Sequence, residues 1–294
     1  MHILLIHQAF TALDEPGGTR HHEFARLLAA DGHRVTVIAS PVSYLTGAAT
    51  AAADADTPGV VIRRAWTYRA LHRSFFHRVL AFFSFMFSSL VLGLRLGPVD
   101  LVWGTSPPIF QGVTAWLLAR LKGVPFLFEV RDLWPDFAIA VGVLKNRTII
   151  RMSLWLERFL YRHADRMMVN SPAYVAHVRG RGARAVELVP NGADPAMFDP
   201  SAKGTDFRRL HGLRDKFVVL YAGAHGMSND LGVVLDCANL LVQETGIHFV
   251  FLGDGKEKPA LQQRAIELDL PNVSFLPPIP KAGMSSALAG ADAC

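Results

Sequence analysis

The feature that most constrains the fold is an alternation of short apolar runs with segments of helical period, which continues along the whole chain. The first cycle runs from an apolar segment at 2–7, through a glycine-containing loop and a helix from Thr19, to a second apolar segment at 33–39. Further strands are predicted at 59–63, 100–103, 124–130, 165–170 and 186–189. Strands that alternate with helices in this way predict an α/β fold with parallel sheets.

The alternation is interrupted once, in the segment VELVPNGADPAMFDP (186–200), where Pro190-Asn191-Gly192 is a strong turn signal. The low periodicity of this segment is typical of an interdomain linker. A second series follows, with strands predicted at 216–223, 247–253 and 272–277 and helices at about 229–244, 257–268 and 281–290. We therefore predict an α/β chain of two Rossmann-like domains, 1–195 and 196–294, of which the second is incomplete.

The last eleven residues, MSSALAGADAC (284–294), are the reason for expecting an incomplete domain. A helix ends near Gly290, and Asp292 then opens what has the pattern of a fourth strand. A parallel sheet that ended there would leave an exposed edge and uncovered apolar faces. The expectation is that the natural protein continues beyond Cys294.

Cysteine and motif content narrow the chemistry. Cys237 and Cys294 form no metal-binding pattern, which predicts a reducing, cytoplasmic protein without structural disulfides or a zinc site. The apolar run before His7 is too short for a signal peptide. Asp54-Ala55-Asp56 resembles a metal-binding DxD pair, but it lies in an alanine-rich run. A metal site at this pair is therefore not favoured.

Positive charge is concentrated in the first half of the chain. Residues 1–195 hold 21 Lys and Arg against 14 Asp and Glu, a balance of +7, whereas residues 196–294 hold 9 against 11, a balance of −2. Six arginines and no acidic residue lie between Thr57 and Val99. No nucleic-acid-binding motif accompanies this charge, so nucleic acid is not predicted as a partner.

The same region contains 16 uncharged residues, Val79 to Leu94, between Arg78 and Arg95. As a helix they would be about 24 Å long, which is short of a bilayer core of about 30 Å. The segment is therefore either a helix buried in the first domain or one that dips into a single leaflet. Arginines and aromatic side chains before it fit a membrane surface, although a solvated basic face is the alternative. The predicted membrane or acceptor residues are Arg64, Arg69, Arg73, Phe75, Phe76 and Arg78.

Two loops of the first half carry candidate site residues. Gly17 and Gly18 stand immediately before a helix, where backbone N–H groups can face an anion, although a flexible turn is the alternative. His21-His22-Glu23 does not form an HExxH zinc motif, because residue 26 is arginine, and the histidines are expected to be solvated.

After the strand at 124–130, the segment EVRDLWPDFA places Glu129, Arg131 and Asp132 at a strand exit. They form either an ion-pair clamp or a group that faces a substrate, and Asp132 is favoured as functional. Ser106 in GTSPPIFQG occupies a similar position and is either a helix cap or a site residue.

In the second half, YAGAHGMSND (221–230) and FLGDGKEKPAL (251–261) are glycine-rich loops that follow strands. Gly253 and Gly255, followed by Lys256, place a cation beside a potential phosphate cradle. Lys258 stands where a dinucleotide-binding fingerprint has its third glycine, and no Walker motif is present. This argues against both NAD enzymes and P-loop NTPases.

Together these motifs resemble family 4 of the retaining glycosyltransferases, which have the two-domain GT-B fold. GGTRHHEFARLLAADGHRVTV resembles the family's opening loop, helix and turn; GTSPPIFQG, FEVRDLWPD, VGVLKNR and LERFLYRHAD are similar to its surface-polysaccharide subgroup, which includes O-antigen N-acetylfucosamine and colanic-acid transferases. VPNGADPAMF, FLGDGKEKPAL and NVSFLPPIPKAGM resemble the start and the strands of the donor domain.

The resemblance implies metal-independent transfer of a sugar from a nucleotide-sugar donor, with retention of configuration, to a polyprenyl-diphosphate-linked glycan. The protein would act at the cytoplasmic face of the inner membrane, against anionic lipid. Asp132 would face the transferred sugar, and the donor-binding residues would be Gly17, Gly18, Arg131, Gly223, His225, Gly253, Gly255, Lys256 and Leu276.

The chain departs from the family pattern in two places. Ala224 and Asn229 stand where many members have the Arg and Lys that hold the diphosphate. The family's paired glutamates would fall beyond Cys294, so this chain is expected to be inactive alone. Two alternatives remain open: a non-catalytic chain that binds an acceptor lipid or a partner, and a GT-B-fold nucleotide-sugar epimerase.

Overall fold

A computed structural model describes residues 1–11, 18–43, 58–69, 75–198 and 201–294, with the side chain of Phe75 left out. The described residues form two compact units, Met1 to Asn191 (unit 1) and Gly192 to Cys294 (unit 2). This division lies inside the predicted linker, a few residues before the predicted boundary at 195.

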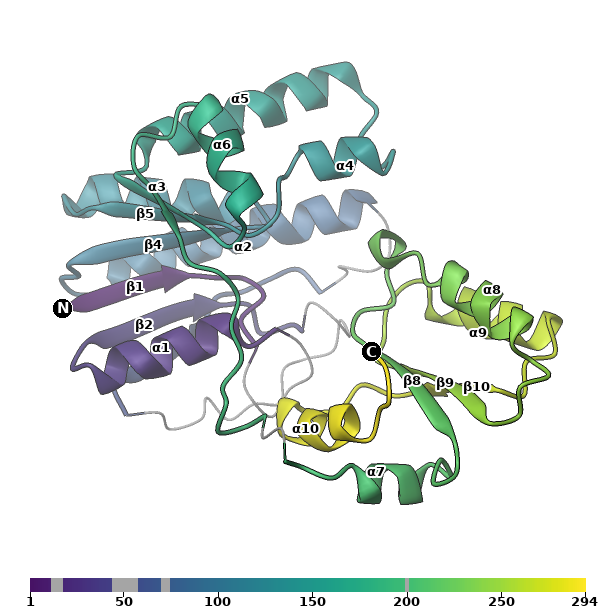
Figure 1. Ribbon diagram of the computed structural model, residues 1–294. Helices are drawn as coiled ribbons and strands as arrows, with labels where there is room; N and C mark the ends of the chain where they lie inside the picture. Colours follow the sequence, from purple (N-terminus) through teal and green to yellow (C-terminus); the bar gives the residue numbers. More distant parts are fainter. Residues whose placement is uncertain (12–17, 44–57, 70–74, 199–200) are drawn as a thin grey trace. The chain divides into compact units, whose positions relative to one another are not determined.

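Unit 1 contains a parallel sheet with strand order β3-β2-β1-β4-β5-β6-β7 (Figure 1). The strands are β1 (His2–Ile6), β2 (Arg34–Ala39), β3 (Val60–Arg64), β4 (Leu101–Ser106), β5 (Phe126–Val130), β6 (Arg166–Val169) and β7 (Val186–Leu188). The strand order runs in one direction from β1 to β3 and in the other from β4 to β7. The carboxyl ends on either side of this switch point, where ligands bind in such sheets, belong to β1 and β4, and β5 lies next to β4.

Helices cover both faces of this sheet. They are α1 (Arg20–Ala30), α2 (Phe75–Arg95), α3 (Phe110–Lys122), α4 (Asp136–Ala140), α5 (Arg147–His163) and α6 (Pro172–Gly180). The period-2 alternation of β1 separates two apolar clusters. Leu4 and Ile6 pack with α2, α3 and α5, whereas Ile3 and Leu5 pack with α1. Close packing of α3 on β4 requires Gly104, because a Cβ there would lie 2.6 Å from the Ala115 Cβ.

Unit 2 has a smaller parallel sheet of order β10-β9-β8, with β8 (Phe217–Ala222), β9 (Ile247–Leu252) and β10 (Val273–Leu276). Its helices are α7 (Thr205–Leu210), α8 (Gly232–Leu240), α9 (Lys258–Glu267) and α10 (Lys281–Ala289), with a 3-10 turn, η1 (Met227–Asn229), after β8. The sheet is buried between two apolar clusters, one of which includes α8 and α9 and the other α7 and α10.

The predicted opening of a further strand at Asp292 is confirmed. Ala293 forms a parallel bridge with Val219, and the Asp292 N–H donates to the Val218 carbonyl at 2.9 Å. The residues after α10 therefore pair with β8 on the edge that β9 does not occupy. The prediction of two α/β domains with parallel sheets is confirmed as well.

Candidate functional site

A buried polar network lies at the carboxyl ends of β1, β4 and β5. The His7 ring, directly after β1, is 2.8 Å from the Thr105 hydroxyl on β4. The Gln111 side-chain amide also donates to this hydroxyl at 2.8 Å, and its oxygen accepts from the Gln8 N–H at 2.7 Å. All four side chains are buried, so the network fixes the loop after β1 against the start of α3.

Glu129, at the end of β5, is the charged centre of this region and is completely buried. Its carboxylate accepts from Arg20 Nε at 3.0 Å and from His21 Nε2 at 2.5 Å. The Arg20 guanidinium also donates to the carbonyls of Val189 (2.6 Å) and Pro190 (2.8 Å). The start of α1 is thereby tied both to β5 and to the chain that leaves β7. The sequence predicted either an ion-pair clamp or a substrate-facing group for Glu129, Arg131 and Asp132. Glu129 forms an ion-pair clamp.

Charges in this network follow from burial and pairing. Burial alone would raise the pKa of Glu129, but His21 and Arg20 outweigh it and lower that pKa, so the carboxylate is ionised. Burial lowers the pKa of His21 despite the attraction of Glu129. Burial, together with the nearby His21 and Arg131, lowers the pKa of His7 well below its ordinary value. Arg20 therefore carries the positive charge, and His21 donates to Glu129 as a neutral ring.

These two histidines predict that unit 1 loses stability in mild acid. An unfolded chain binds a proton at each ring near the ordinary histidine pKa of 6.5, whereas burial makes the folded unit resist protonation. Stability should be complete above pH 6.5 and should fall below it, by up to about 1.4 kcal/mol per pH unit for each ring. All five tryptophans lie in unit 1, so fluorescence-monitored urea unfolding between pH 8 and pH 5 measures it. A pH-independent unfolding free energy over this range would contradict the prediction.

The structure corrects two interpretations of this region. His21 and His22 are buried and not solvated, because α1 lies with these residues against β1 and β4. Ser106 does not cap α3, which begins after Ile109 without a side-chain cap. Ser106 is instead buried at the end of β4, where its carbonyl accepts from the Arg131 N–H at 3.0 Å.

Asp132, the predicted catalytic residue, is exposed on the loop after β5. Arg131 holds this loop through its side chain, which donates to the Pro107 carbonyl at 3.2 Å. Burial and the charge of Asp132 raise the pKa of Tyr174, which places this tyrosine of α6 near the carboxylate. No sequence signal pointed to Tyr174. Gly18 is exposed directly before α1, and Gly17 lies outside the described residues.

A second buried charge network supports the Asp132 loop. The Arg181 guanidinium, at the end of α6, donates to Glu157 of α5 and, at 2.7 Å, to Asp136 of α4. Glu157 is completely buried, and the His177 ring lies 3.4 Å from its other oxygen. Burial, and then Glu157, raise the pKa of Tyr161 above its ordinary range. Arg181 thus joins α4, α5 and α6. Of these, α4 begins directly after the loop that carries Asp132.

In unit 2, the two glycine-rich loops interlock through their backbones. The His225 N–H donates to the Asp254 carbonyl at 2.9 Å, and the Glu257 N–H donates to the His225 carbonyl at 3.0 Å. A Cβ on Gly253 would lie 1.9 Å from the Gly223 carbonyl oxygen, and one on Gly255 would lie 2.4 Å from that of His225. Both glycines have positive φ, 146° and 157°. The structure therefore brings Gly223, His225, Gly253 and Gly255 together at the carboxyl ends of β8 and β9.

His225 is fully buried between these loops, beside Tyr221, Phe251 and Phe275. Within the described residues, neither of its ring nitrogens has a hydrogen-bond partner. Burial, and then the charge of Lys258, lower its pKa, so the ring is neutral. A buried ring with two unsatisfied nitrogens is a rare and costly arrangement, and it marks this position as a candidate ligand contact.

The lysine inside the loop is Lys258 and not Lys256. Lys258 Nζ donates to the carbonyls of Gly253 at 2.7 Å and Leu276 at 2.9 Å, joining the ends of β9 and β10. Lys256 is exposed. The signal for Lys258 was present in the sequence, since this residue replaces the third glycine of a dinucleotide-binding pattern. The carbonyl of Leu276, one of the predicted donor-binding residues, is already bonded to Lys258.

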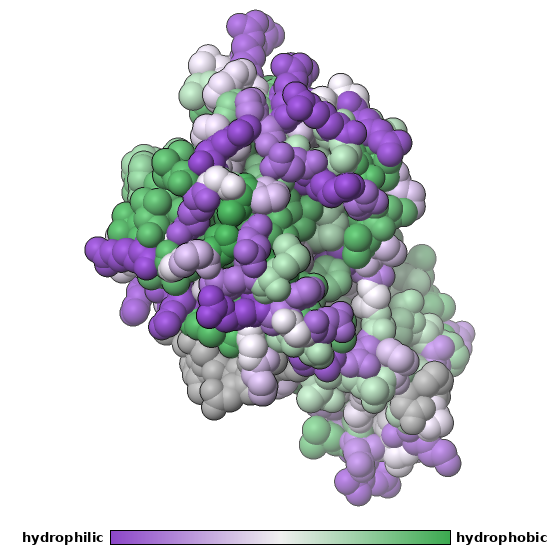
Figure 2. All heavy atoms as spheres, turned by 90° about the vertical axis from the view of Figure 1, so that its left-hand side faces the viewer, coloured by the Kyte–Doolittle hydropathy of each residue, from purple (hydrophilic) through white to green (hydrophobic). Residues whose placement is uncertain are grey.

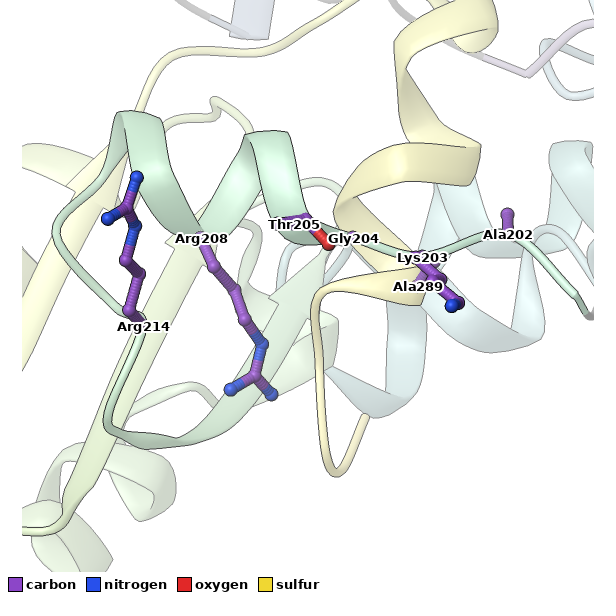
Figure 3. Close-up of a pocket in the computed structure, with 7 residues that line it drawn as sticks. All are labelled: Ala202, Lys203, Gly204, Thr205, Arg208, Arg214 and Ala289. Atoms are coloured by element: carbon purple, nitrogen blue, oxygen red, sulfur yellow. The ribbon is translucent and has the colours of Figure 1, made fainter.

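A hollow of about 510 Å³ elsewhere in unit 2 contains none of the predicted donor residues (Figure 3). Its lining includes Arg208, whose guanidinium donates to the Gly290 and Lys216 carbonyls and, at 2.5 Å, to Asp292. The Val218 N–H, and then Arg208, lower the pKa of Asp292. Figure 3 shows Arg208 and Arg214 pointing in different directions. Arg208 is thus a structural tie between α7, β8 and the end of α10.

Residues 17–192 match the Glycosyl transferase 4-like domain family, which is more than half of the chain. The chain belongs to this family. The resemblance derived from the motifs is confirmed.

Two curated relatives are consistent with this family. The putative colanic acid biosynthesis glycosyl transferase WcaI of Escherichia coli K12 is 27% identical over 87% of this chain, and the probable glycosyltransferase WbjE of Pseudomonas aeruginosa is 26% identical over 72%. The matched regions cover 66% and 53% of these proteins, so the chain spans only part of their length.

Solved structures show the GT-B fold of this family member. Sucrose-phosphate synthase of Thermosynechococcus elongatus superimposes with a TM-score of 0.73, and Anabaena HepE, solved with UDP and glucose, with a TM-score of 0.70. Each is 17% identical and matches 99% of this chain, covering 74% and 72% of the other protein.

The predicted membrane and acceptor residues lie in or near α2. Arg64 ends β3, where it donates to the Ser40 carbonyl, and Arg69 and Phe76 are exposed. Arg78 lies in the first turns of α2, whereas Arg73 lies outside the described residues. By length and composition α2 could cross a membrane, and only 22% of its most apolar stretch is buried.

Within the described residues, no group of three or more His, Cys, Asp or Glu side chains is placed to hold a metal ion. Asp54 and Asp56 lie outside the described residues.

Proposed function

We propose that this chain is the glycosyltransferase part of an enzyme that moves a sugar from a nucleotide-sugar donor to a lipid-linked glycan in surface polysaccharide synthesis. Family membership supports the transfer chemistry. The observation that carries the proposal is the pair of interlocked glycine loops in unit 2, with His225 buried between them. HepE, which shares the fold, was solved with UDP and with UDP-glucose.

In this proposal the nucleotide binds at the carboxyl ends of β8 and β9. The N–H groups of Glu257 and Lys258 are already bonded to the His225 and Gly255 carbonyls, so the N-terminus of α9 offers a diphosphate the positive end of its helix dipole and the charge of Lys258, its first residue. These groups take the place of the Arg and Lys that are replaced here by Ala224 and Asn229. Lys256, although exposed, is close enough in sequence to contribute.

Transfer with retention would need little from the protein beyond orientation and stabilisation of the leaving diphosphate. Asp132 and Gly18 are the proposed contacts of unit 1 with the transferred sugar and the diphosphate, and Arg131 holds the Asp132 loop in place. Because the leaving group is stabilised by these fixed groups, we propose that no metal is required.

We further propose that the acceptor is a polyprenyl-diphosphate-linked glycan and that the protein works at the cytoplasmic face of the inner membrane. The apolar, weakly buried helix α2 and the surrounding arginines support this location. An acceptor with a polyprenyl tail stays in the bilayer, so an enzyme held at the surface meets it at high local concentration.

The test is calorimetric titration of the chain with UDP, GDP and ADP. One of these should bind, and Lys256→Ala should weaken binding of the diphosphate about fivefold, as expected for one charged contact. Lys203→Ala, at the hollow of Figure 3, is the matched control and should have no effect. If only Lys203→Ala lost affinity, the phosphate site would lie at this hollow and not at the glycine loops.

Binding alone does not distinguish a transferase from an epimerase. Because this chain is expected to be inactive alone, the protein extended to the length of its relatives should be incubated with a radiolabelled donor, with and without lipid extracts that contain polyprenyl-diphosphate glycans. Label that enters the lipid fraction supports transfer. An isomer of the donor that forms without lipid would instead support the epimerase.

A further inference from the structure

Helix α2 exposes a face of large apolar side chains, in addition to the apolar face that it buries. Its buried face carries Ala81, Phe85 and Ser89, with Gly93 against Leu118 of α3, where a Cβ would come within 2.5 Å. Its outward face is a continuous apolar stripe at helical spacing: Phe76, Leu80, Phe83, Phe87, Val91 and Leu94, all exposed. We call these six residues the α2 stripe. Exposed apolar patches of this kind mark interaction surfaces.

The packing of α2 shows how the stripe can meet a partner. The Thr114 hydroxyl of α3 donates to the Met86 carbonyl at 2.9 Å, and the small residues of the inner face bring the two helices together. A membrane-spanning orientation would require α2 to leave this contact. When α2 stays packed in unit 1, the stripe is exposed to a partner along the full length of the helix, which is about 32 Å.

Helix α5 presents a second interfacial surface on the same side of the sheet. α3 packs against both α2 and α5, on the face opposite α1. Trp155 and Met152 of α5 are 64% and 65% exposed, and the Trp155 ring stacks on Phe159 at 5.5 Å. Beside them, Arg147, Arg151, Arg158 and Arg162 form an exposed row at helical spacing. Figure 2 shows apolar surface gathered on one flank of unit 1.

The charges on these three helices select the partner. They carry eight Arg and Lys, two on α2, two on α3 and four on α5. Their one acidic residue, Glu157, is buried and paired with Arg181. A groove of about 540 Å³ beside the stripe is lined by Trp66, Phe87 and Val91 together with Arg64 and Arg95. Apolar and aromatic side chains beside arginines, on helices whose one acidic residue is buried, match acyl chains beneath anionic headgroups.

We propose that the outer faces of α2 and α5 together form one docking surface for an anionic phospholipid bilayer, with α2 lying in the plane of the leaflet. The α2 stripe enters the apolar layer, and Trp155 and the α5 arginines contact the headgroups. This inference rests on the membrane association proposed above. It extends the predicted contact through the segment before α2 to the outer faces of two helices.

Flotation of the purified chain with phosphatidylcholine–phosphatidylglycerol vesicles, and with phosphatidylcholine vesicles, tests the proposal. The chain should float with the anionic vesicles. Phe87→Glu should weaken binding at least about tenfold, because it puts a charge in the stripe. The double variant R151Q/R158Q should lose about tenfold or more on anionic vesicles. Leu240→Glu, on exposed α8 of unit 2, is the control and should bind like the parent chain.

Quenching by bromine-labelled lipids is a second measurement that needs no destabilising variant. The parent chain should be quenched more than Trp155→Phe, because Trp155 lies in the interface. Equal quenching of the parent chain and Trp155→Phe would show that α5 is not part of the docking surface.

The remaining outcomes separate this inference from the proposal beneath it. A parent chain that does not float refutes membrane association itself. A parent chain that floats, with both helix variants equal to Leu240→Glu, refutes the α2–α5 surface but leaves the membrane proposal standing. A dimer in the absence of vesicles, dissociated by Phe87→Glu without loss of flotation, would show that a second copy covers the stripe. Resistance of the bound chain to carbonate extraction would overturn the in-plane orientation.

Discussion

Glu129→Ala is expected to destabilise unit 1 by about 3–5 kcal/mol, the cost of removing one partner from a buried ion pair. The variant leaves the Arg20 guanidinium, 14% exposed, and the buried His21 ring without their shared acceptor. Arg20 would also lose the anchor that aligns it with the Val189 and Pro190 carbonyls. Urea unfolding followed by tryptophan fluorescence measures the effect on unit 1 alone, since unit 2 contains no tryptophan.

Glu187→Ala is the matched control, because Glu187 pairs with Arg166 at a similar distance, 2.9 Å, but both side chains are more than half exposed. This pair should contribute less than about 1 kcal/mol. Equal unfolding free energies for the two variants would mean that burial of the Glu129 cluster carries no energetic weight.

Gly253→Ala is expected to destabilise unit 2 by about 3–5 kcal/mol, because backbone strain and overpacking act together. The residue has φ of +146°, and the new Cβ would meet the Gly223 carbonyl oxygen at 1.9 Å. Since the oxygen belongs to the backbone and the Cβ is rigidly attached to the backbone, neither can rotate away, so the loops must separate and His225 would lose its enclosure. Hydrogen–deuterium exchange should show faster exchange in β8 and β9, together with loss of nucleotide binding.

Gly246→Ala provides the comparison within the same unit. Gly246 precedes β9, and no atom lies within 4 Å of a Cβ built there. This variant should exchange and bind nucleotide like the parent chain. If Gly253→Ala did so too, the interlocked loops would not be the nucleotide site.

Tertiary structure reassigned several polar residues. The local helical pattern allows His21 and His22 to lie on the solvent face of α1, and no neighbouring residue in the sequence predicts that they are buried. The partner of His21 is Glu129, 108 residues away, which becomes a neighbour when β5 joins the sheet beside β4. Similarly, the sequence does not distinguish Lys256 from Lys258 as the lysine of the loop. The structure does, because only the Lys258 side chain donates to the Gly253 and Leu276 carbonyls.

Local patterns, in contrast, were sufficient for the framework. Strands and helices were predictable because their periods are properties of neighbouring residues, and parallel order follows from strict alternation. Glycines at strand exits identified the loops of unit 2, since few other residues adopt a positive φ. The apolar segment before Arg95, which contains no acidic residue, predicted a helix that is either buried in the first domain or inserted into a single leaflet.

The sequence by itself thus determined the fold class, the order of the elements, the family and the loops that carry the candidate site. Only the tertiary structure decided which charges are paired, that His225 is enclosed, and that α2 exposes a stripe of large apolar side chains while α5 shares its side of the sheet. The physical reason is that periodicity records how often a side chain faces one direction but not what lies there. Burial and pairing depend on contacts between residues far apart in the chain, and these exist only once the sheet has assembled.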